Sequence, residues 1–167
     1  EQLGIAELLA VRKQPKPVMP HGGPLGVRDT LAFDNEAQYL VSRGYAVLKV
    51  NYRGSEGFGR DFFEAGYRAR GKQIEDDIEL ALDHALAKYP LDPQRVGLVG
   101  ASYGGYSALM GLVRSQRYRC AVAIAAPTDV ALSFTAADWA NSPETRALMT
   151  RLVGDPNKRF AICFCYA

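Results

Sequence analysis

The sequence predicts an α/β fold with a partial, doubly wound, mostly parallel sheet. Two short apolar runs do not alternate between apolar and polar residues, as a strand with one solvent-exposed face would: Tyr45–Tyr52 and Arg95–Gly100. Such runs are typical of parallel strands covered on both faces. Between them, Gln73–Lys88 carries apolar residues at the spacing of about 3.6 residues that marks an amphipathic helix. Strands that alternate with helices in this way predict a parallel sheet with crossover helices.

The other elements follow from run length and from the positions of glycine and proline. Strands are expected at Lys16–Pro20 and, again as a buried run, at Tyr118–Ala126. Helices are expected at Asn35–Ser42, at Gly104–Arg114 and from about Pro143, the last after an insertion with aromatic residues. The sequence shows no internal repeat and no low-complexity tract.

Composition and charge exclude several classes of protein. The 167 residues and 48% hydrophobic content suit a single domain, and a net charge of +2 gives no field for nucleic acid or anionic membrane. No run approaches the ~20 apolar residues of a membrane span. The three cysteines, Cys120, Cys163 and Cys165, lack zinc-ligand spacing, so no metal or cofactor is expected. They favour a reducing, cytoplasmic compartment; a periplasmic location would require an export signal upstream of Glu1.

The pentapeptide between the run at 95–100 and the next helix fits the pattern G-x-S-x-G: Gly100-Ala101-Ser102-Tyr103-Gly104. A strand that turns abruptly into a helix strains the central residue and leaves no room for side chains at the flanking glycines. Its hydroxyl then lies beside a helix N-terminus, which favours developing negative charge. An ordinary N-cap serine is the alternative, but this context and the additional Gly105 argue against it. We predict that Ser102 is a catalytic nucleophile on an α/β-hydrolase fold.

A second glycine motif, His21-Gly22-Gly23-Pro24, lies near the end of the first expected strand. Hydrolases of this fold take half of their oxyanion hole from such a position. Two glycines let the backbone approach a reacting carbonyl, and Pro24 stiffens the exit. We predict that the oxyanion donors are the backbone amides of Gly23 and Tyr103, and that His21 organises the loop and is not the base. Taken alone, the tetrapeptide is only a loop signal.

Three ordered motifs resemble the prolyl oligopeptidase family of serine peptidases, in its acylaminoacyl-peptidase and dipeptidyl-peptidase-like branch. They are the stretches 20–24, 44–59 and 100–106, supported by Asp76-Asp77 and Gly154-Asp155-Pro156. The resemblance covers about residues 17 to 156. It implies a nucleophile at Ser102, an oxyanion hole at the positions of Gly23 and Tyr103, and cleavage of short peptides. It also implies an N-terminal β-propeller that restricts access, and no part of this sequence could form one.

The histidine of a catalytic triad is missing downstream of Ser102. In this fold the order along the chain is nucleophile, acid, histidine. His21 and His84 both precede the serine, and His84 falls within the helix expected at 73–88. The acids that follow are Asp129, Asp138, Glu144 and Asp155, none of which has a histidine after it. We therefore expect residues 1–167 to be a partial catalytic domain, truncated at both ends and nearly inactive by itself.

Two further readings remain open at this stage. Because a fold does not fix a substrate, an esterase or lipase on the same scaffold is one alternative. The other is a non-catalytic module that binds a partner through an exposed sheet edge or the segment Phe134–Trp139. Losing the strands beyond Tyr118–Ala126 would leave that strand at an edge, so self-association through it is also expected. The segment Phe160–Ala167 departs from the pattern expected after the Gly-Asp-Pro turn, which indicates a frameshifted or a mis-joined end.

Overall fold

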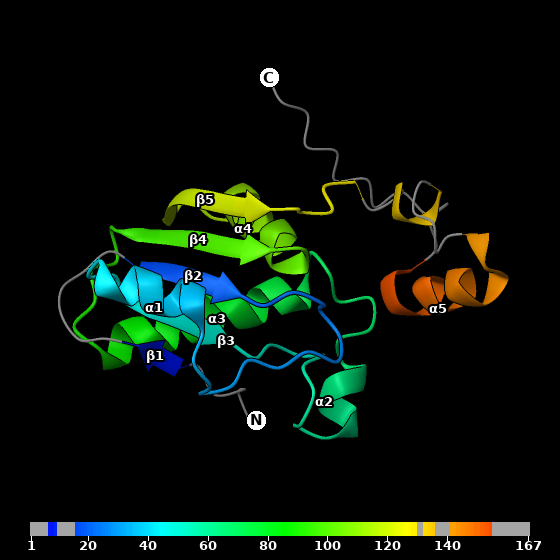
Figure 1. Ribbon diagram of the computed structural model, residues 1–167, viewed down its shortest axis with the longest axis horizontal. Helices are drawn as coiled ribbons and strands as arrows, with labels where there is room; N and C mark the ends of the chain where they lie inside the picture. The colour runs from blue at the N-terminus through cyan, green and yellow to red at the C-terminus, as the bar shows by residue number, and fades with distance from the viewer. Residues whose placement is uncertain (1–6, 10–15, 130–131, 136–140, 155–167) are drawn as a thin grey trace.

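The computed structural model describes residues 7–9, 16–129, 132–135 and 141–154. In this part of the chain the sheet has the strand order β1-β3-β2-β4-β5 (Figure 1). Its strands are β1 (Glu7–Leu9), β2 (Lys16–Pro20), β3 (Val47–Val50), β4 (Val96–Ala101) and β5 (Tyr118–Ile124). Only β1 runs antiparallel to its neighbour, β3. The predicted α/β fold with a mostly parallel sheet is thus confirmed.

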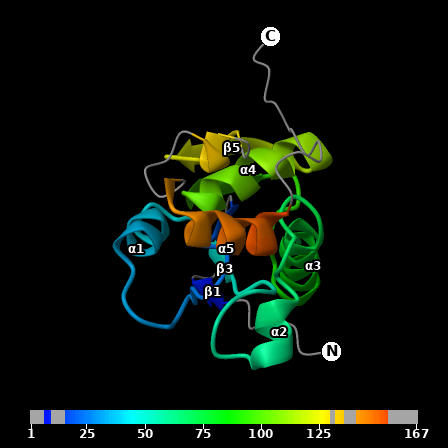
Figure 2. The ribbon, with the colours of Figure 1, turned by 90° about the vertical axis from the view of Figure 1, so that its right-hand side faces the viewer.

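Helices cover both faces of this sheet, as a doubly wound arrangement requires (Figure 2). On one side lies α1 (Asn35–Ser42), and on the other lie α3 (Gln73–Lys88) and α4 (Tyr103–Arg114). The shorter elements are α2 (Arg60–Glu64), a 3-10 turn at Leu132–Phe134 and α5 (Pro143–Val153). The helices at 35–42, 73–88 and 104–114 were predicted within one residue, whereas β1 and α2 were not predicted.

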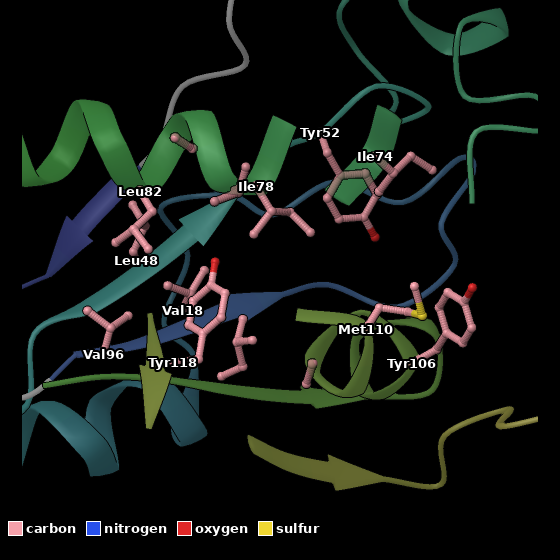
Figure 3. Packing of buried hydrophobic residues seen from close by; sticks show 14 of the residues in the cluster. Val18, Leu48, Tyr52, Ile74, Ile78, Leu82, Val96, Tyr106, Met110 and Tyr118 are labelled. Atoms are coloured by element: carbon pink, nitrogen blue, oxygen red, sulfur yellow. The ribbon is translucent and has the colours of Figure 1, made fainter. Parts of the chain in front are cut away.

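Alternate residues of the central strands enter two separate apolar clusters. Val18 and Leu48 belong to the larger cluster beneath α3 and α4, which also contains Ile78, Leu82 and Val96 (Figure 3). On the opposite face, Met19 and Val47 pack with Ala37, Leu40 and Val41. This alternation follows from the period of two along a strand, so both faces of β2 and β3 are buried. The apolar runs of these strands reflect that double burial.

Local signals explain where the helices begin and end. The Asp34 side chain accepts a hydrogen bond from Ala37 N (2.9 Å) at the start of α1, and Ser142 caps α5 just ahead of Pro143. Both are the residue types that satisfy the free amides of a first helical turn. Pro90 follows α3 and holds Tyr89 in an extended conformation, which ends that helix.

The strand β5 was predicted correctly in place but differs in burial. The apolar run at 118–126 indicated a strand covered on both faces, yet only Tyr118 is buried, and Val122 and Ile124 are 51% and 46% exposed. Among the described residues no strand pairs with the outer edge of β5. None of the helices in the described ranges has the length and apolarity of a membrane span.

Several features singled out in the sequence lie outside the described residues. They are Asp138, Trp139, Asp155, Pro156 and the segment 160–167 with Cys163 and Cys165.

Candidate active site

Ser102 lies in the turn between β4 and α4. Figure 1 shows this turn at the edge where the parallel strands end. The backbone of Ser102 has φ 54° and ψ −122°, a conformation that costs a residue with a side chain about 1 to 3 kcal/mol. Two hydrogen bonds hold it there. Ser102 N donates to the Ile124 oxygen (2.8 Å), and the Ser102 oxygen accepts from Tyr106 N (3.1 Å). The exposed serine is therefore presented at the N-terminus of α4.

The glycines around the serine are required by space. A Cβ atom at Gly100 would lie 2.4 Å from the carbonyl group of Gly104, and one at Gly104 would lie 2.0 Å from the Pro20 oxygen. One at Gly105 would lie 3.0 Å from Ala126 Cβ. Real Cβ atoms do not approach a backbone carbonyl at 2.0 to 2.4 Å. The turn can pass this closely between β2 and β5 because these positions carry no side chain.

The loop after β2 passes directly beside the serine. A Cβ atom at Gly22 would lie 3.5 Å from the Ala101 oxygen and 3.6 Å from Ser102 Cβ. The next residue, Gly23, is exposed and has φ 119°, a value that side chains disfavour. A cis peptide bond joins it to the buried Pro24. The structure thus brings the two glycine motifs of the sequence together at one edge of the sheet.

His21 is buried at the base of this loop. Its ring stacks on Tyr52, with centroids 4.2 Å apart, and Tyr52 Oη donates to the His21 carbonyl (2.6 Å). Nδ1 lies 2.7 Å from the Gly22 carbonyl oxygen, which can only accept, so Nδ1 carries a proton. Nε2 lies 2.8 Å from Ser55 Oγ. Both ring nitrogens are therefore engaged, and burial lowers the pKa of His21.

This contact has a consequence for the neighbouring amide. In a planar trans peptide the C=O and N–H groups point in opposite directions. Because His21 Nδ1 fixes the Gly22 carbonyl, it also fixes the orientation of the Gly23 N–H in the same peptide unit. Through its contact with the Gly22 carbonyl, His21 consequently sets the direction of the Gly23 N–H.

The remaining candidates of the sequence have other surroundings or other partners. His84 is exposed on α3. Asp129 accepts a hydrogen bond from Leu132 N (3.2 Å), and Glu144 accepts one from Ser142 Oγ (2.5 Å). Within the described ranges no histidine or carboxylate hydrogen-bonds the serine side chain, and no three ligating side chains gather to hold a metal ion.

An exposed serine thus lies between a glycine loop and a helix N-terminus, both of which offer backbone amides. Residues 31–157 match the prolyl oligopeptidase family. The chain belongs to this family. A curated relative in it, dipeptidyl aminopeptidase BIII from Pseudoxanthomonas mexicana, is 37% identical over 145 residues, which cover 85% of this chain and 20% of the relative. The acylamino-acid-releasing enzyme of Arabidopsis thaliana is 41% identical over 86 residues, covering 52% of this chain and 11% of that enzyme.

Solved structures of the prolyl oligopeptidase family show the same fold. The acylaminoacyl peptidase of Pyrococcus horikoshii superimposes with a TM-score of 0.83 and 27% identity, over 92% of this chain and 25% of that one. These comparisons confirm the α/β-hydrolase fold and the acylaminoacyl-peptidase and dipeptidyl-peptidase-like resemblance. They also establish that the chain spans about a fifth of dipeptidyl aminopeptidase BIII and a quarter of the solved acylaminoacyl peptidase.

Three residues that support the candidate site were not predicted from the sequence to do so. Tyr52 and Ser55 hold His21, and Glu75 accepts a hydrogen bond from the Tyr103 phenol (2.8 Å). Glu75 could have been noticed because it is an acid next to Ile74, on a helix whose apolar side packs on the core. For Tyr52 and Ser55 the sequence offered only their place in the motif at 44–59.

The loop after β3 is fastened to α3 by Arg53. Its backbone amide and its Nε donate to Asp77 Oδ2 (3.0 and 2.7 Å), and its Nη2 donates to Oδ1 (2.7 Å). The Asp77 carboxylate in turn raises the pKa of Arg53. Such bidentate pairs fix geometry as well as supplying energy. Since Tyr52 and Ser55 flank Arg53, this pair also steadies the residues that hold His21.

Proposed function

We propose that this chain is the nucleophile-bearing part of a serine peptidase that hydrolyses short peptides through an acyl-enzyme at Ser102. The observation that carries the proposal is the strained, exposed backbone of Ser102 at a helix N-terminus, held beside the glycine loop. A serine in this strained turn with nearby amides suits attack on a carbonyl carbon. Relatives named dipeptidyl aminopeptidase and acylamino-acid-releasing enzyme support peptides as the substrate class.

In the proposed reaction Ser102 Oγ attacks the scissile carbonyl carbon, and the carbonyl oxygen becomes an oxyanion. The backbone amides of Gly23 and Tyr103 receive that charge, and the positive end of the α4 dipole favours it. The serine proton passes to a histidine base, which then protonates the leaving amine, and water hydrolyses the acyl-enzyme. Burial and hydrogen bonding of His21 at both ring nitrogens support excluding it as that base.

We also propose that residues 1–167 are a partial catalytic domain. Both histidines of the sequence precede Ser102, so the triad acid and histidine are assigned to other parts of a longer protein, as is any propeller. Without its base the serine is a poor nucleophile at neutral pH, because triad members act as a unit. The 167-residue chain is therefore expected to be nearly inactive.

We propose that the complete protein binds peptides and that copies of this chain associate with one another. An acylaminoacyl peptidase has been solved in complex with Z-Gly-Gly-Phe-chloromethyl ketone, and it matches this chain with a TM-score of 0.83. This supports peptides as ligands of the complete protein. The exposed edge and face of β5 support association between copies of the chain.

A fluorophosphonate probe tests the proposal, because it labels only an activated serine. The 167-residue chain should react slowly, and a version extended with the part of dipeptidyl aminopeptidase BIII that follows the matched region should react about 10⁴-fold faster. Ser102→Ala should abolish labelling in both. The extended version should cleave peptide substrates; activity on simple esters alone would favour the esterase reading. Rapid labelling of the 167-residue chain at Ser102 would mean that the base lies within it, and His84 with Asp129 would need to be reconsidered.

A further inference from the structure

Glu75 is an acid buried beneath the turn that carries Ser102. It belongs to the first turn of α3 and is 4% exposed, and it is the one buried acidic residue among the described residues. Burying a carboxyl group costs several kcal/mol unless hydrogen bonds or charges compensate. A buried acid at this place therefore calls for a role that an apolar side chain would not fill.

One carboxylate oxygen of Glu75 holds the start of α4. Oε1 accepts from Tyr103 Oη and from Ser107 Oγ, both at 2.8 Å. Tyr103 and Ser107 are one helical turn apart, so both side chains lie on the α4 face that meets α3. Tyr103 is 1% exposed, and its ring lies 6.0 Å from that of Tyr52. The first turn of α4 is thus tied to α3 as well as to the sheet.

We propose that Glu75 is a positioning residue that fixes the backbone amide of Tyr103 by holding the phenol of the same residue. The inference rests on the proposed function, in which that amide receives the developing negative charge. Tyr103 directly follows Ser102, so any shift of the first turn of α4 also moves the serine. Oxyanion stabilisation depends on donors held in place before the reaction, which is the property that this contact supplies.

The charge on Glu75 bears on the same site. Burial raises its pKa, and the hydrogen bonds from Ser107 and Tyr103 act in the opposite direction. The positive charge of Arg114 also favours the charged form of Glu75. The guanidinium of Arg70 lies 5.3 Å from the centre of the Tyr103 ring, and it is attracted to the Glu75 carboxylate. The phenols that face the carboxyl group belong to Tyr52, Tyr103 and Tyr106.

A negative charge on Glu75, which contacts the far end of the Tyr103 side chain, would oppose a second one forming at the Tyr103 amide. Glu75 Oε2 and Arg70 Nε have no hydrogen-bond partner within the described part of the chain. Protonation at Oε2 would therefore leave both donors of Oε1 in place. The Tyr103 amide should sense that titration through its own side chain.

The first test needs no catalysis. The 167-residue chain is labelled with ¹⁵N-tyrosine, which gives nine amide signals, and Tyr103→Phe identifies the one of interest. That signal should move with a midpoint above 4.5, the ordinary pKa of a glutamate. Glu75→Gln should abolish the titration. Glu79→Gln should keep it, because Glu79 lies one turn along the same helix and accepts a hydrogen bond from Arg117 Nη1 (2.7 Å) instead. A titration unchanged by Glu75→Gln, or no movement at all, would overturn the proposal.

The second test uses fluorophosphonate labelling of the extended chain described above. Glu75→Gln keeps an acceptor for Tyr103 and should label within about threefold of the parent, with a changed pH profile. Glu75→Leu leaves both hydroxyls unpaired and should label about tenfold or more slowly, part of the ~100-fold loss that follows removal of an oxyanion donor. A folded Glu75→Leu variant that labels at the parent rate would overturn the proposal.

The amide titration and the labelling test distinguish a failure of the proposed function from a failure of the proposed role of Glu75. If the extended parent does not label at Ser102, the proposed function fails, and the amide titration still decides the contact between Glu75 and Tyr103. If Glu75→Leu does not fold, the Glu75→Gln variant and its Glu79→Gln control still give the answer.

Discussion

The conformation of Ser102 depends on neighbours that leave it no alternative. Its strain of about 1 to 3 kcal/mol must be offset by contacts that a relaxed turn would lose. Those contacts include hydrogen bonds to Ile124 and Tyr106, and the close packing of Gly104 on the Pro20 carbonyl. The geometry of the serine is thus a property of β2, β4, β5 and α4 together.

Replacing Gly104 by alanine should destabilise the fold. The new Cβ would lie 2.0 Å from the Pro20 oxygen, so the backbone of β2 or α4 must move, at a cost of about 3 kcal/mol. The free energy of unfolding, measured with urea, gives the value. Gly22→Ala is the matched control, since its Cβ would meet nothing closer than 3.5 Å. Equal losses in the two variants would show that the close approach at Gly104 does not exist.

Among the elements, the loop at 51–59 joins the glycine loop to α3. Gly26 N donates to the Gly54 oxygen (3.1 Å) and Glu56 N to the Val27 oxygen (3.3 Å), which connects the two loops along their backbones. Arg53 then connects the second loop to α3 through Asp77. Movement of α3 would therefore reach the glycine loop through this path.

The contribution of the ion pair is measurable with Asp77→Ala. This change removes three hydrogen bonds to Arg53, two of them between charged groups, and should lower the free energy of unfolding by about 2 kcal/mol. The Arg53 side chain is 32% exposed, so solvent screening keeps the loss from being larger.

Asp76→Ala is the control for this change, because Asp76 is 57% exposed and pairs with Arg114 on the surface. Its loss should stay under about 1 kcal/mol. Urea unfolding of both variants makes the comparison, and a larger loss for Asp76→Ala would contradict the assigned role of Asp77.

Helices and strands with a clear period were predictable, and short elements were not. The helix α3 shows the helical period over 16 residues, and β4 is a short apolar run that follows prolines and precedes the glycine motif. By contrast, β1 has three residues and α2 has five, too few to show a pattern. The residues that support the site were missed for another reason. Glu75 and Tyr103 meet only because α3 and α4 pack side by side, and no local pattern in the sequence records such a contact.

At the scale of the whole molecule, the two faces of the sheet are covered unequally. The large cluster under α3 and α4 fills one face, and on the other face α1 covers β3 and β2 but not β5. A groove of about 440 Å³ remains there, with Leu40, Val99, Cys120 and Val122 in its walls. It lies on the sheet face away from α4, so it is separate from the candidate active site.

We expect the chain to self-associate through β5. Exposed backbone groups at a strand edge and the apolar residues Val122 and Ile124 are a recognised template for pairing. Domains are stable by only ~5 to 15 kcal/mol, so an uncovered face is a sizeable loss. Sedimentation should give a concentration-dependent mass above 18.3 kDa.

Val122→Lys should reduce this association, because a charge on an edge strand opposes pairing. Leu31→Lys is the control, since Leu31 is 82% exposed but lies in the loop after β2. A monodisperse monomer with a sharp thermal transition would count against association through β5.

The packing of Gly104 on Pro20 also bears on the order in which the chain folds. The turn at Ser102 contacts β2, which precedes it by about 80 residues, and β5, which follows it. Contacts between distant segments form slowly, because the chain between them must first close into a loop. A partly folded chain would thus display an ordinary, relaxed serine. The strained backbone of Ser102 would form only as β5 docks, so a nascent polypeptide would lack this geometry until its sheet is assembled.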